Sequence, residues 1–588
     1  MIGAFLLALT TAVPLQAIKL SSGYAFARSG KVAAKSYVLP TKGEAALSIV
    51  RDGITVDLAG TSVRSSANDQ AAFEGTGLLL VNRRNVTIKN ARISGYRFNI
   101  RLLNCQNIRL ENCQVDRSRA IRIATPEGRP IDFFVNIRDL EVWRTYGSGI
   151  WLENTHGSKV VSCRGSSAQN GLLMVGSNEN IVENCDFSFN SGWGIGLARS
   201  SRNQILWNRA DFVSRPWGGG WGGDAAGVAV VDGSSENYFV GNSFTHGGDG
   251  FFLTDRTNGG YNAATKTFNF EGSSDNNVIA NNDGSWSPAN AFEGTFSFGN
   301  VYLRNLANES NYGFWLGFSS DSLIARNDIW GSRSDAIAIE QGSHNAVELN
   351  DIQHTGATAV HLWSGTAPEH KTRPSANNRI ASNRILDAAN AYSLENSTAT
   401  VVTENSIEQA KIPGDGVLST PTELETKLFL ASDRYQRLQR MLAKRPAGFL
   451  YYRETGMPQG LKWVEAGEFA PRDFRKDVLA YRRVNESELE IEGVQRRAYH
   501  ITHSPEVEMV PAPGNRAAYT IRPLLGPGAI GGFIDPKIVA TQGEKSQTIS
   551  TPLFATDWLV RWFNWDKDRL KIDDTAAWAA LFSTTPVV

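Results

Sequence analysis

The sequence predicts an all-β chain built as a parallel β-solenoid, and three observations support this. First, asparagines recur after short apolar-alternating segments, and Asn305, Asn327 and Asn350 are spaced by 22 and 23 residues. Second, a strand-like unit of the form small-apolar-x-apolar follows each of them after about ten residues, as at 336–339. Third, this period is too short for a βαβ unit and shows no helical pattern, so each repeat fits one solenoid turn.

The repeat extends over most of the chain and gives 13 turns. Stacked at about 4.8 Å, they would form a rod roughly 60 Å long. A buried amide repeated at one corner can hydrogen-bond to the turns above and below it, so we expect the asparagines to form a structural ladder. The other positions assigned to the ladder are Asn90, Asn112, Leu140, Ser162, Asn184, Asn208, Asn242, Asn282, Asn383 and Asn405.

Copies such as Asn-Asp-Ile at 327–329 and Asn-Cys-Asp-Phe at 184–187 resemble the right-handed parallel β-helix repeat of the pectin-lyase-like superfamily. The resemblance covers roughly residues 45–410 and implies a right-handed parallel β-helix. This superfamily includes polysaccharide lyases, glycoside hydrolases, uronan epimerases, phage tailspikes and adhesins, so the resemblance specifies the fold better than the activity. Phrases at 248–253, 290–297 and 339–342 also resemble a group of secreted bacterial β-helix proteins.

Five regions are expected in chain order. Residues 1–17 have the shape of a secretory signal without its basic start, which predicts a secreted or periplasmic protein. Residues 18–75 would form a cap and first rung, and 76–412 the β-helix. Residues 413–447 read as a linker helix with a Thr-x-x-Glu capping pattern from Thr422 to Glu425, and 448–588 as a β-rich domain. No later run of eighteen apolar residues occurs, so no membrane insertion is expected.

The amino-acid composition argues against several kinds of ligand. Lys plus Arg and Asp plus Glu both number 59, and no long basic run occurs, which argues against nucleic acid. Cys113, Cys163 and Cys185 each follow a ladder position, so we expect a buried column of thiols, with a disulfide between rungs as the alternative. Cys105 lies in the same half of the rod. No CxxC pair and no Cys/His spacing typical of metal ligands occurs, so no metal site is expected. We also expect the protein to be a monomer.

Three rungs are lengthened, and they place the binding face in the second half of the rod. The steps that follow Asn208, Asn242 and Asn350 are 34, 40 and 33 residues. Insertions in repeat proteins map to loops on one face, often the binding face. The first inserted loop contains three residues that we expect to close over a substrate as a lid, namely Trp217, Trp221 and Asp224.

Strand alternation predicts which side chains point outward beside these loops. Glu293 and Glu340 are two rungs apart and offset by one outward position, so strand spacing separates them by roughly 9–12 Å. Side-chain reach would bring the carboxyls toward the roughly 6.5–9.5 Å separation of inverting glycosidases. Solvated glutamates on a rod face are the plainer alternative. The predicted outward group is Phe252, Glu293, Trp315, Glu340, His361 and Trp363.

Each of these residue types suits carbohydrate chemistry. One glutamate would protonate a leaving glycosidic oxygen while the other activates water. Asp249 is a third catalytic candidate, although an Asp between glycines is also a turn former. His361 would act as a base or bind a hydroxyl, and the aromatic side chains would stack on sugar rings. His246 and Asp335 are weaker candidates.

The leading hypothesis is therefore an exported polysaccharide-active glycoside hydrolase without a cofactor. A polysaccharide lyase or uronan epimerase is the second hypothesis. It would need a cationic or Ca²⁺ clamp on the substrate carboxylate, and Arg256, Lys266 and Arg333 are the only obvious cations near the predicted face. The third hypothesis is a non-catalytic carbohydrate-binding or surface protein.

Overall fold

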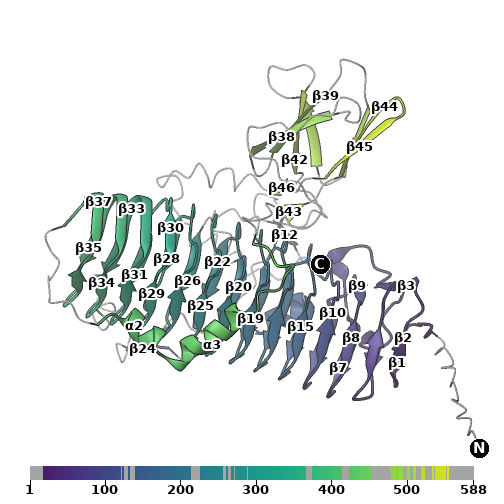
Figure 1. Ribbon diagram of the computed structural model, residues 1–588. Helices are drawn as coiled ribbons and strands as arrows, with labels where there is room; N and C mark the ends of the chain where they lie inside the picture. Colours follow the sequence, from purple (N-terminus) through teal and green to yellow (C-terminus); the bar gives the residue numbers. More distant parts are fainter. Residues whose placement is uncertain are drawn as a thin grey trace, which may run out of the picture.

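The computed structural model shows a rod of stacked parallel strands with small antiparallel sheets beside it (Figure 1). In the rod and its flanking helices the structure describes residues 17–120, 122–124, 130–132, 140–213, 225–255, 260–262, 267–270, 272–287, 289–365, 374–413 and 423–451. In the last part of the chain it describes 479–485, 488–493, 500–503, 507–511, 518–523, 533–534, 537–550 and 553–554.

Two long parallel sheets form the rod, and most rungs give one strand to each. The first sheet has 16 strands: β1 (Tyr24–Phe26), β4 (Ala45–Ile49), β7 (Thr76–Val81), β10 (Phe98–Leu103), β14 (Ser148–Glu153), β16 (Asn170–Val175), β18 (Trp193–Ala198), β20 (Ala226–Val231), β22 (Asp249–Leu253), β26 (Asn290–Gly294), β28 (Tyr312–Trp315), β31 (Ile337–Glu340), β33 (Asp351–Trp363), β35 (Arg384–Glu395) and β37 (Ser406–Lys411), with β30 (Asp328–Trp330) paired to β33. We call this sheet A.

The second sheet, sheet B, has 14 strands: β2 (Gly30–Lys31), β5 (Thr55–Asp57), β8 (Thr87–Lys89), β11 (Arg109–Glu111), β15 (Lys159–Val161), β17 (Ile181–Glu183), β19 (Gln204–Leu206), β21 (Tyr238–Val240), β25 (Val278–Ala280), β27 (Val301–Leu303), β29 (Leu323–Ala325), β32 (Ala346–Glu348), β34 (Arg379–Ala381) and β36 (Val401–Thr403). A third, short sheet lies at the start of the rod and consists of β3 (Ser36–Val38), β6 (Ser62–Arg64) and β9 (Arg92–Ser94), and η1 (Gln70–Ala72) follows β6.

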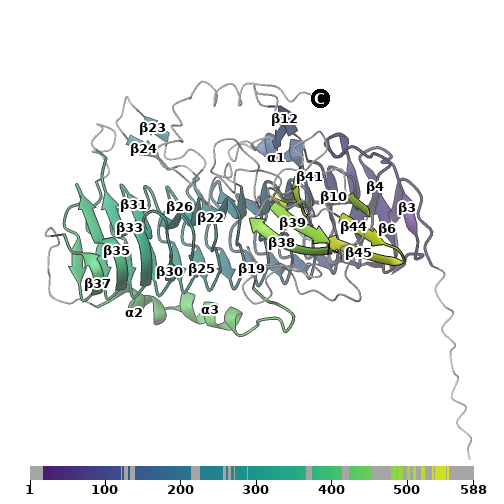
Figure 2. The same cartoon turned by 90° about the horizontal axis from the view of Figure 1, so that it is seen from above.

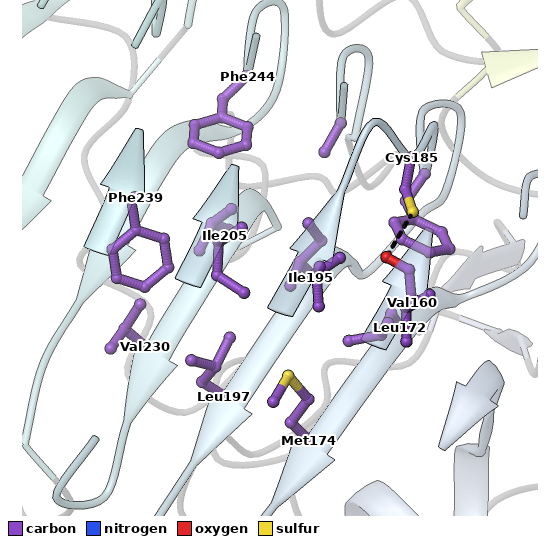
Figure 3. Close-up of a cluster of buried hydrophobic side chains, with 14 of the residues drawn as sticks. Val160, Leu172, Met174, Cys185, Ile195, Leu197, Ile205, Val230, Phe239 and Phe244 are labelled. Atoms are coloured by element: carbon purple, nitrogen blue, oxygen red, sulfur yellow. Dashed lines mark hydrogen bonds between the residues drawn. The ribbon is translucent and has the colours of Figure 1, made fainter. Parts of the chain in front are cut away.

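Apolar side chains of sheets A and B fill the interior of the rod. Figure 3 shows Ile195 and Leu197 from β18 near Ile205 and Phe239 from sheet B. The buried Cys185 thiol donates to the Val160 carbonyl oxygen at 3.5 Å. All four cysteines are buried and free, so the thiol prediction is confirmed over the disulfide alternative.

The asparagine ladder is present in the second half of the rod. Asn305 Oδ1 accepts hydrogen bonds from the backbone N–H and from Nδ2 of Asn282, at 3.0 and 3.1 Å. Asn305 Nδ2 in turn donates to the Ile279 carbonyl and to Asn327 Oδ1, at 2.9 and 3.1 Å. The same pattern runs from Asn208 to Asn405, and it satisfies backbone groups that the corner would otherwise leave unpaired.

In the first half of the rod the predicted ladder is wrong by one residue. Asn184 N–H donates to the Leu206 carbonyl, so Asn184 lies beside Trp207 of the next rung and not beside Asn208. Cys185 instead takes the inward position, and its N–H donates to Asn208 Oδ1 at 2.9 Å. The thiols therefore continue the ladder column itself. The misassigned residues Asn90, Asn112, Ser162 and Asn184 have positive φ and form a neighbouring turn column.

No rung is centred on Leu140, so that predicted repeat is also wrong. Strand β11 pairs directly with β15, with Leu110 opposite Val160. The intervening chain forms a hairpin of β12 (Arg122–Ala124) and β13 (Pro130–Asp132), and the helix α1 (Leu140–Tyr146). Trp143 of α1 packs on Trp193 with ring centroids 4.7 Å apart, so this insertion covers the outer face of sheet A in its first half.

Two helices cover the outer face of sheet B in its second half (Figures 1 and 2). The predicted single linker helix is split into α2 (Glu425–Leu430) and α3 (Asp433–Leu442). Thr422 of the expected capping pattern lies outside the described residues, and Leu424, the N-cap of α2, makes no side-chain cap hydrogen bond. Instead, the buried Glu348 carboxylate of β32 accepts hydrogen bonds from the backbone N–H groups of Glu425 and Thr426, at 3.1 and 2.9 Å.

The described strands after the helices are antiparallel and share their own apolar cluster. They form a four-stranded sheet of β38 (Leu479–Asn485), β39 (Glu488–Gly493), β42 (Ala518–Pro523) and β41 (Val507–Pro511), a three-stranded sheet of β40 (His500–His503), β44 (Lys537–Gln542) and β45 (Lys545–Ser550), and the pair β43 (Phe533–Ile534) and β46 (Leu553–Phe554). Another hairpin, β23 (Gly260–Asn262) and β24 (Thr267–Asn269), projects on the same side of the rod as α1 (Figure 2).

Candidate functional site

Sheet A presents its outward side chains in the register that the sequence predicts. In one column Phe252 lies opposite Glu293, which lies opposite Trp315 on the next strand. In the adjacent column Glu340 lies opposite Trp363, and Trp363 opposite Glu395. We call the five residues Glu293, Trp315, Glu340, Trp363 and Glu395 the carboxylate–indole stripe. They occupy five consecutive strands of sheet A, from β26 to β35.

Glu340 lies where the two indoles come together. The Trp315 and Trp363 rings have centroids 5.6 Å apart and are tilted by 60°. Gly317 lies beside Glu340 in the same column, and a Cβ placed on it would be 3.6 Å from Trp315 Nε1 and 4.0 Å from Glu340 Cβ. The missing side chain therefore leaves the indole N–H edge of Trp315 open toward Glu340.

Glu293 is held by an amide that a buried aspartate supports. Asn290 Nδ2 donates to Glu293 Oε2 at 2.7 Å. Asp249 Oδ1 accepts from both the N–H and Nδ2 of Asn290 at 3.0 Å. Asp249 is only 2% exposed and supports Glu293 through Asn290.

His361 lies between two carboxylates at the other end of the stripe. Its Nδ1 is 2.9 Å from Asp335 Oδ2, and its Nε2 is 3.5 Å from Glu395 Oε1. The imidazole also packs against Trp363, with centroids 4.4 Å apart and planes 31° apart. His361 thus contacts two residues of the stripe, Trp363 and Glu395, and also Asp335 outside it.

The model of the family described as "Right handed beta helix region" matches residues 52–258 and 261–372, more than half of the chain. This protein belongs to the right-handed β-helix family. A search of curated proteins finds no match.

The chain is also similar, at low sequence identity, to several solved structures. A variant of the periplasmic alginate epimerase AlgG is 11% identical over 66% of this chain and 85% of its own, with a TM-score of 0.36. The Azotobacter vinelandii mannuronan C-5 epimerase AlgE4 A-module is 15% identical over 68% and 91%, with a TM-score of 0.32. A GH87 α-1,3-glucanase catalytic domain in complex with nigerose is 11% identical over 70% and 69%, with a TM-score of 0.35. All three act on carbohydrates, and the family of this chain is shown by the family model and not by these structures.

The other predicted residues of this β-helix do not belong to the stripe. Phe252 is only 5% exposed and belongs to the apolar cluster on the outer face of sheet A. His246 is stacked between Phe212 and Trp286, at centroid distances of 4.5 and 5.0 Å. Burial raises the pKa of the Glu309 carboxylate, and the charge of Arg333 offsets only part of that rise. Five predicted residues lie outside the described residues, namely Trp217, Trp221, Asp224, Arg256 and Lys266.

A third column of polar side chains lies at the starts of strands in sheet A, and most of it was not identified from the sequence. Asp249 and Asn290 begin β22 and β26, Tyr312 begins β28, and Asp335 occupies the same position before β31. The pKa of the Tyr312 hydroxyl is raised by burial and by the Asp335 charge. These residues directly precede the small residue of each small-apolar-x-apolar unit, and that regular position is the signal that could have identified them.

No group of three or more His, Cys, Asp or Glu side chains suited to a metal ion occurs in the part of the chain that the structure describes. Within the same residues, no helix is long and apolar enough to span a membrane.

Proposed function

We propose that this right-handed β-helix protein binds a polysaccharide along the carboxylate–indole stripe and hydrolyses a glycosidic bond there. One observation carries the proposal: on five consecutive strands of sheet A, one outward residue per strand follows the order carboxylate, indole, carboxylate, indole, carboxylate, the first two in one column and the last three in the adjacent column. Indole faces stack on the apolar faces of sugar rings. At about 4.8 Å per rung, the Cα atoms of carboxylates two rungs apart are about 10–12 Å apart, and an indole lies between them.

This arrangement supplies both parts of an inverting hydrolysis. With one sugar on Trp315 and the next on Trp363, the bond between them would lie over Glu340. Glu340 then protonates the departing oxygen, while a carboxylate beyond one of the two sugars removes a proton from the attacking water. Glu293 stands on the Trp315 side and Glu395 on the Trp363 side, so the stripe offers a base in either direction.

The negative charge on the outward columns of sheet A favours the hydrolase hypothesis over the lyase or epimerase hypothesis. From β22 to β35, none of the described residues in the three outward columns is Lys or Arg. A uronate carboxylate placed on these columns would face Asp335, Glu340 and Glu395 without a cation from the same columns, and like charges at this range repel. A neutral polysaccharide avoids that repulsion.

The test is turnover of a panel of neutral and acidic polysaccharides, read both by reducing-end release and by the ultraviolet absorbance of unsaturated uronates. We expect reducing ends without that absorbance. Glu340→Gln should lower the rate by on the order of 10²–10⁴-fold. Glu404→Gln, an exposed glutamate in a turn of the rod, is the matched control. Absorbance would assign a lyase, and binding without turnover would assign a carbohydrate-binding protein.

Export and a monomeric state are part of the same proposal. The apolar stretch within residues 1–17 supports export to the periplasm or beyond, where extracellular polysaccharide is encountered. Cell fractionation and size-exclusion chromatography with light scattering test the two statements.

A further inference from the structure

The geometry around Asp335 fixes the protonation of one imidazole nitrogen. Asp335 Oδ1 accepts the backbone N–H of Thr358 at 2.9 Å, and Oδ2 lies 2.9 Å from His361 Nδ1. An ionised carboxylate can only accept hydrogen bonds, so each group that faces one of its oxygens must donate. His361 Nδ1 therefore carries a hydrogen, and in the neutral imidazole Nε2 is left as the proton acceptor.

His361 Nε2 is an acceptor with a single carboxylate in reach. The atom is buried and hydrogen-bonds to no group that the structure describes. Its neighbour is Glu395 Oε1 at 3.5 Å, beyond the usual length of an N–H···O hydrogen bond. The ring packs on Trp363, and with Nδ1 against Asp335 its Nε2 faces Glu395. A proton arriving on the Glu395 carboxylate would close this gap and pass to Nε2.

Of the three groups Asp335, His361 and Glu395, Glu395 is the one most exposed to solvent. Its side chain is 67% exposed, against 21% for His361 and 14% for Asp335. It lies directly beyond Trp363 in the column of Glu340. A water molecule held between a sugar on Trp363 and Glu395 would thus have a carboxylate beside it, and that carboxylate has a proton acceptor behind it.

We infer that Glu395 is the general base of the proposed hydrolysis, that His361 accepts its proton, and that Asp335 positions the imidazole. This inference rests on the proposed function, and it assigns which of the two sugars the water attacks. The water oxygen bonds to the anomeric carbon of the sugar on Trp363, and its proton passes through Glu395 to His361 Nε2. The bond from that carbon to the glycosidic oxygen breaks, and the oxygen takes its proton from Glu340. Exchange with solvent then restores the neutral imidazole and the protonated Glu340.

Glu293 is less suited to this role. Its carboxylate has Asn290 Nδ2 as a hydrogen-bond partner, and an amide donor cannot take up a proton from it. Behind Asn290 stands Asp249, which holds the amide in a fixed orientation. This arrangement fixes Glu293 as an acceptor for sugar hydroxyls on the Trp315 side.

The first test is the tautomer of His361, read by ¹⁵N NMR of protein labelled at histidine, with the signal assigned by its loss in His361→Gln. At a pH where the imidazole is neutral, we expect the Nδ1–H form, the minor form of free histidine. Asp335→Asn should shift the population toward Nε2–H. Asp387→Asn is the matched control, because His354 and Asp387 form a second pair, 2.8 Å apart, away from the stripe. An Nε2–H form in the unmodified protein would overturn the relay.

The second test is kinetic and uses whichever panel polysaccharide the protein degrades. Glu395→Gln should lower kcat by on the order of 10²–10⁴-fold, and Asp335→Asn by about tenfold or more, with KM changed little. Glu395→Asp keeps the carboxylate but retracts it, so its loss should be smaller. Turnover with an unchanged kcat in Glu395→Gln would overturn the base assignment and leave hydrolysis standing. No turnover by the unmodified protein would overturn both the proposed function and the base assignment, while the tautomer would still decide the relay.

Discussion

Replacing one ladder asparagine should destabilise the whole rod, and the cost can be worked out at Asn305. Asn305→Ala removes two hydrogen bonds accepted by Oδ1 and two donated by Nδ2. It leaves the buried Asn282 N–H without its acceptor, at a cost of about 1–3 kcal/mol, and each other lost bond costs about 0.5–1.5 kcal/mol. We therefore expect the free energy of unfolding to fall by about 3–7 kcal/mol.

Urea unfolding followed by far-ultraviolet circular dichroism measures this change. The matched control is Asn184→Gly, at a position that the sequence pattern also assigned to the ladder. Asn184 has a φ of 53° and an exposed hydrogen bond to Ser162, so glycine should cost less than about 1 kcal/mol there. Equal effects of the two substitutions would refute the assigned register and the energetic role of the buried amides.

Three further predictions concern packing and charge. Gly294→Ala should lower the free energy of unfolding by about 2 kcal/mol or more in urea unfolding, because its Cβ would overlap the buried Tyr302 hydroxyl, and the loss should shrink in a Tyr302→Phe background. Glu348→Ala should cost about 2–4 kcal/mol and speed amide exchange in α2, since it removes the acceptor of that helix's first N–H groups. Burial would raise the pKa of Glu153, but hydrogen bonds from Arg144 and a neighbouring indole outweigh it and hold that pKa below its usual value. The resulting stability is present above the unfolded-state pKa of about 4.3 and is lost as pH falls through the lower folded-state pKa, so acid unfolding of Glu153→Gln should depend less on pH in that window.

The outward face of sheet A could be predicted because strand alternation is a local property. The predicted outward residues from Phe252 to Trp363 have the predicted register. The ladder in the first half could not be assigned by residue type alone. Asparagine suits both the inward ladder and the adjacent turn position with positive φ, and thiols replace it at the inward position. The 50 residues from Asn112 to Ser162 are about two repeat lengths, so spacing alone predicts a rung at Leu140, but they form a hairpin and a helix outside the stack of rungs.

The candidate site was only partly predictable, because its contacts run between rungs. Glu340, Trp315 and Trp363 follow from alternation. Glu395 stands in the same column, but its significance comes from the contact with His361 on the preceding strand, which no sequence pattern records. Asp249 has a residue type suited to catalysis, yet its place at a strand start buries it against Asn290.

The most direct test of the account is binding of polysaccharide to the Glu340→Gln protein, measured by affinity electrophoresis in gels that contain each member of the panel. The account predicts that at least one neutral polysaccharide retards the protein. It also predicts that Trp315→Ala combined with Trp363→Ala abolishes the retardation. Trp330→Ala, at an exposed tryptophan away from the stripe, should leave it unchanged. Retardation that survives loss of both stripe indoles would contradict the claim that the sugar chain lies on this face of sheet A.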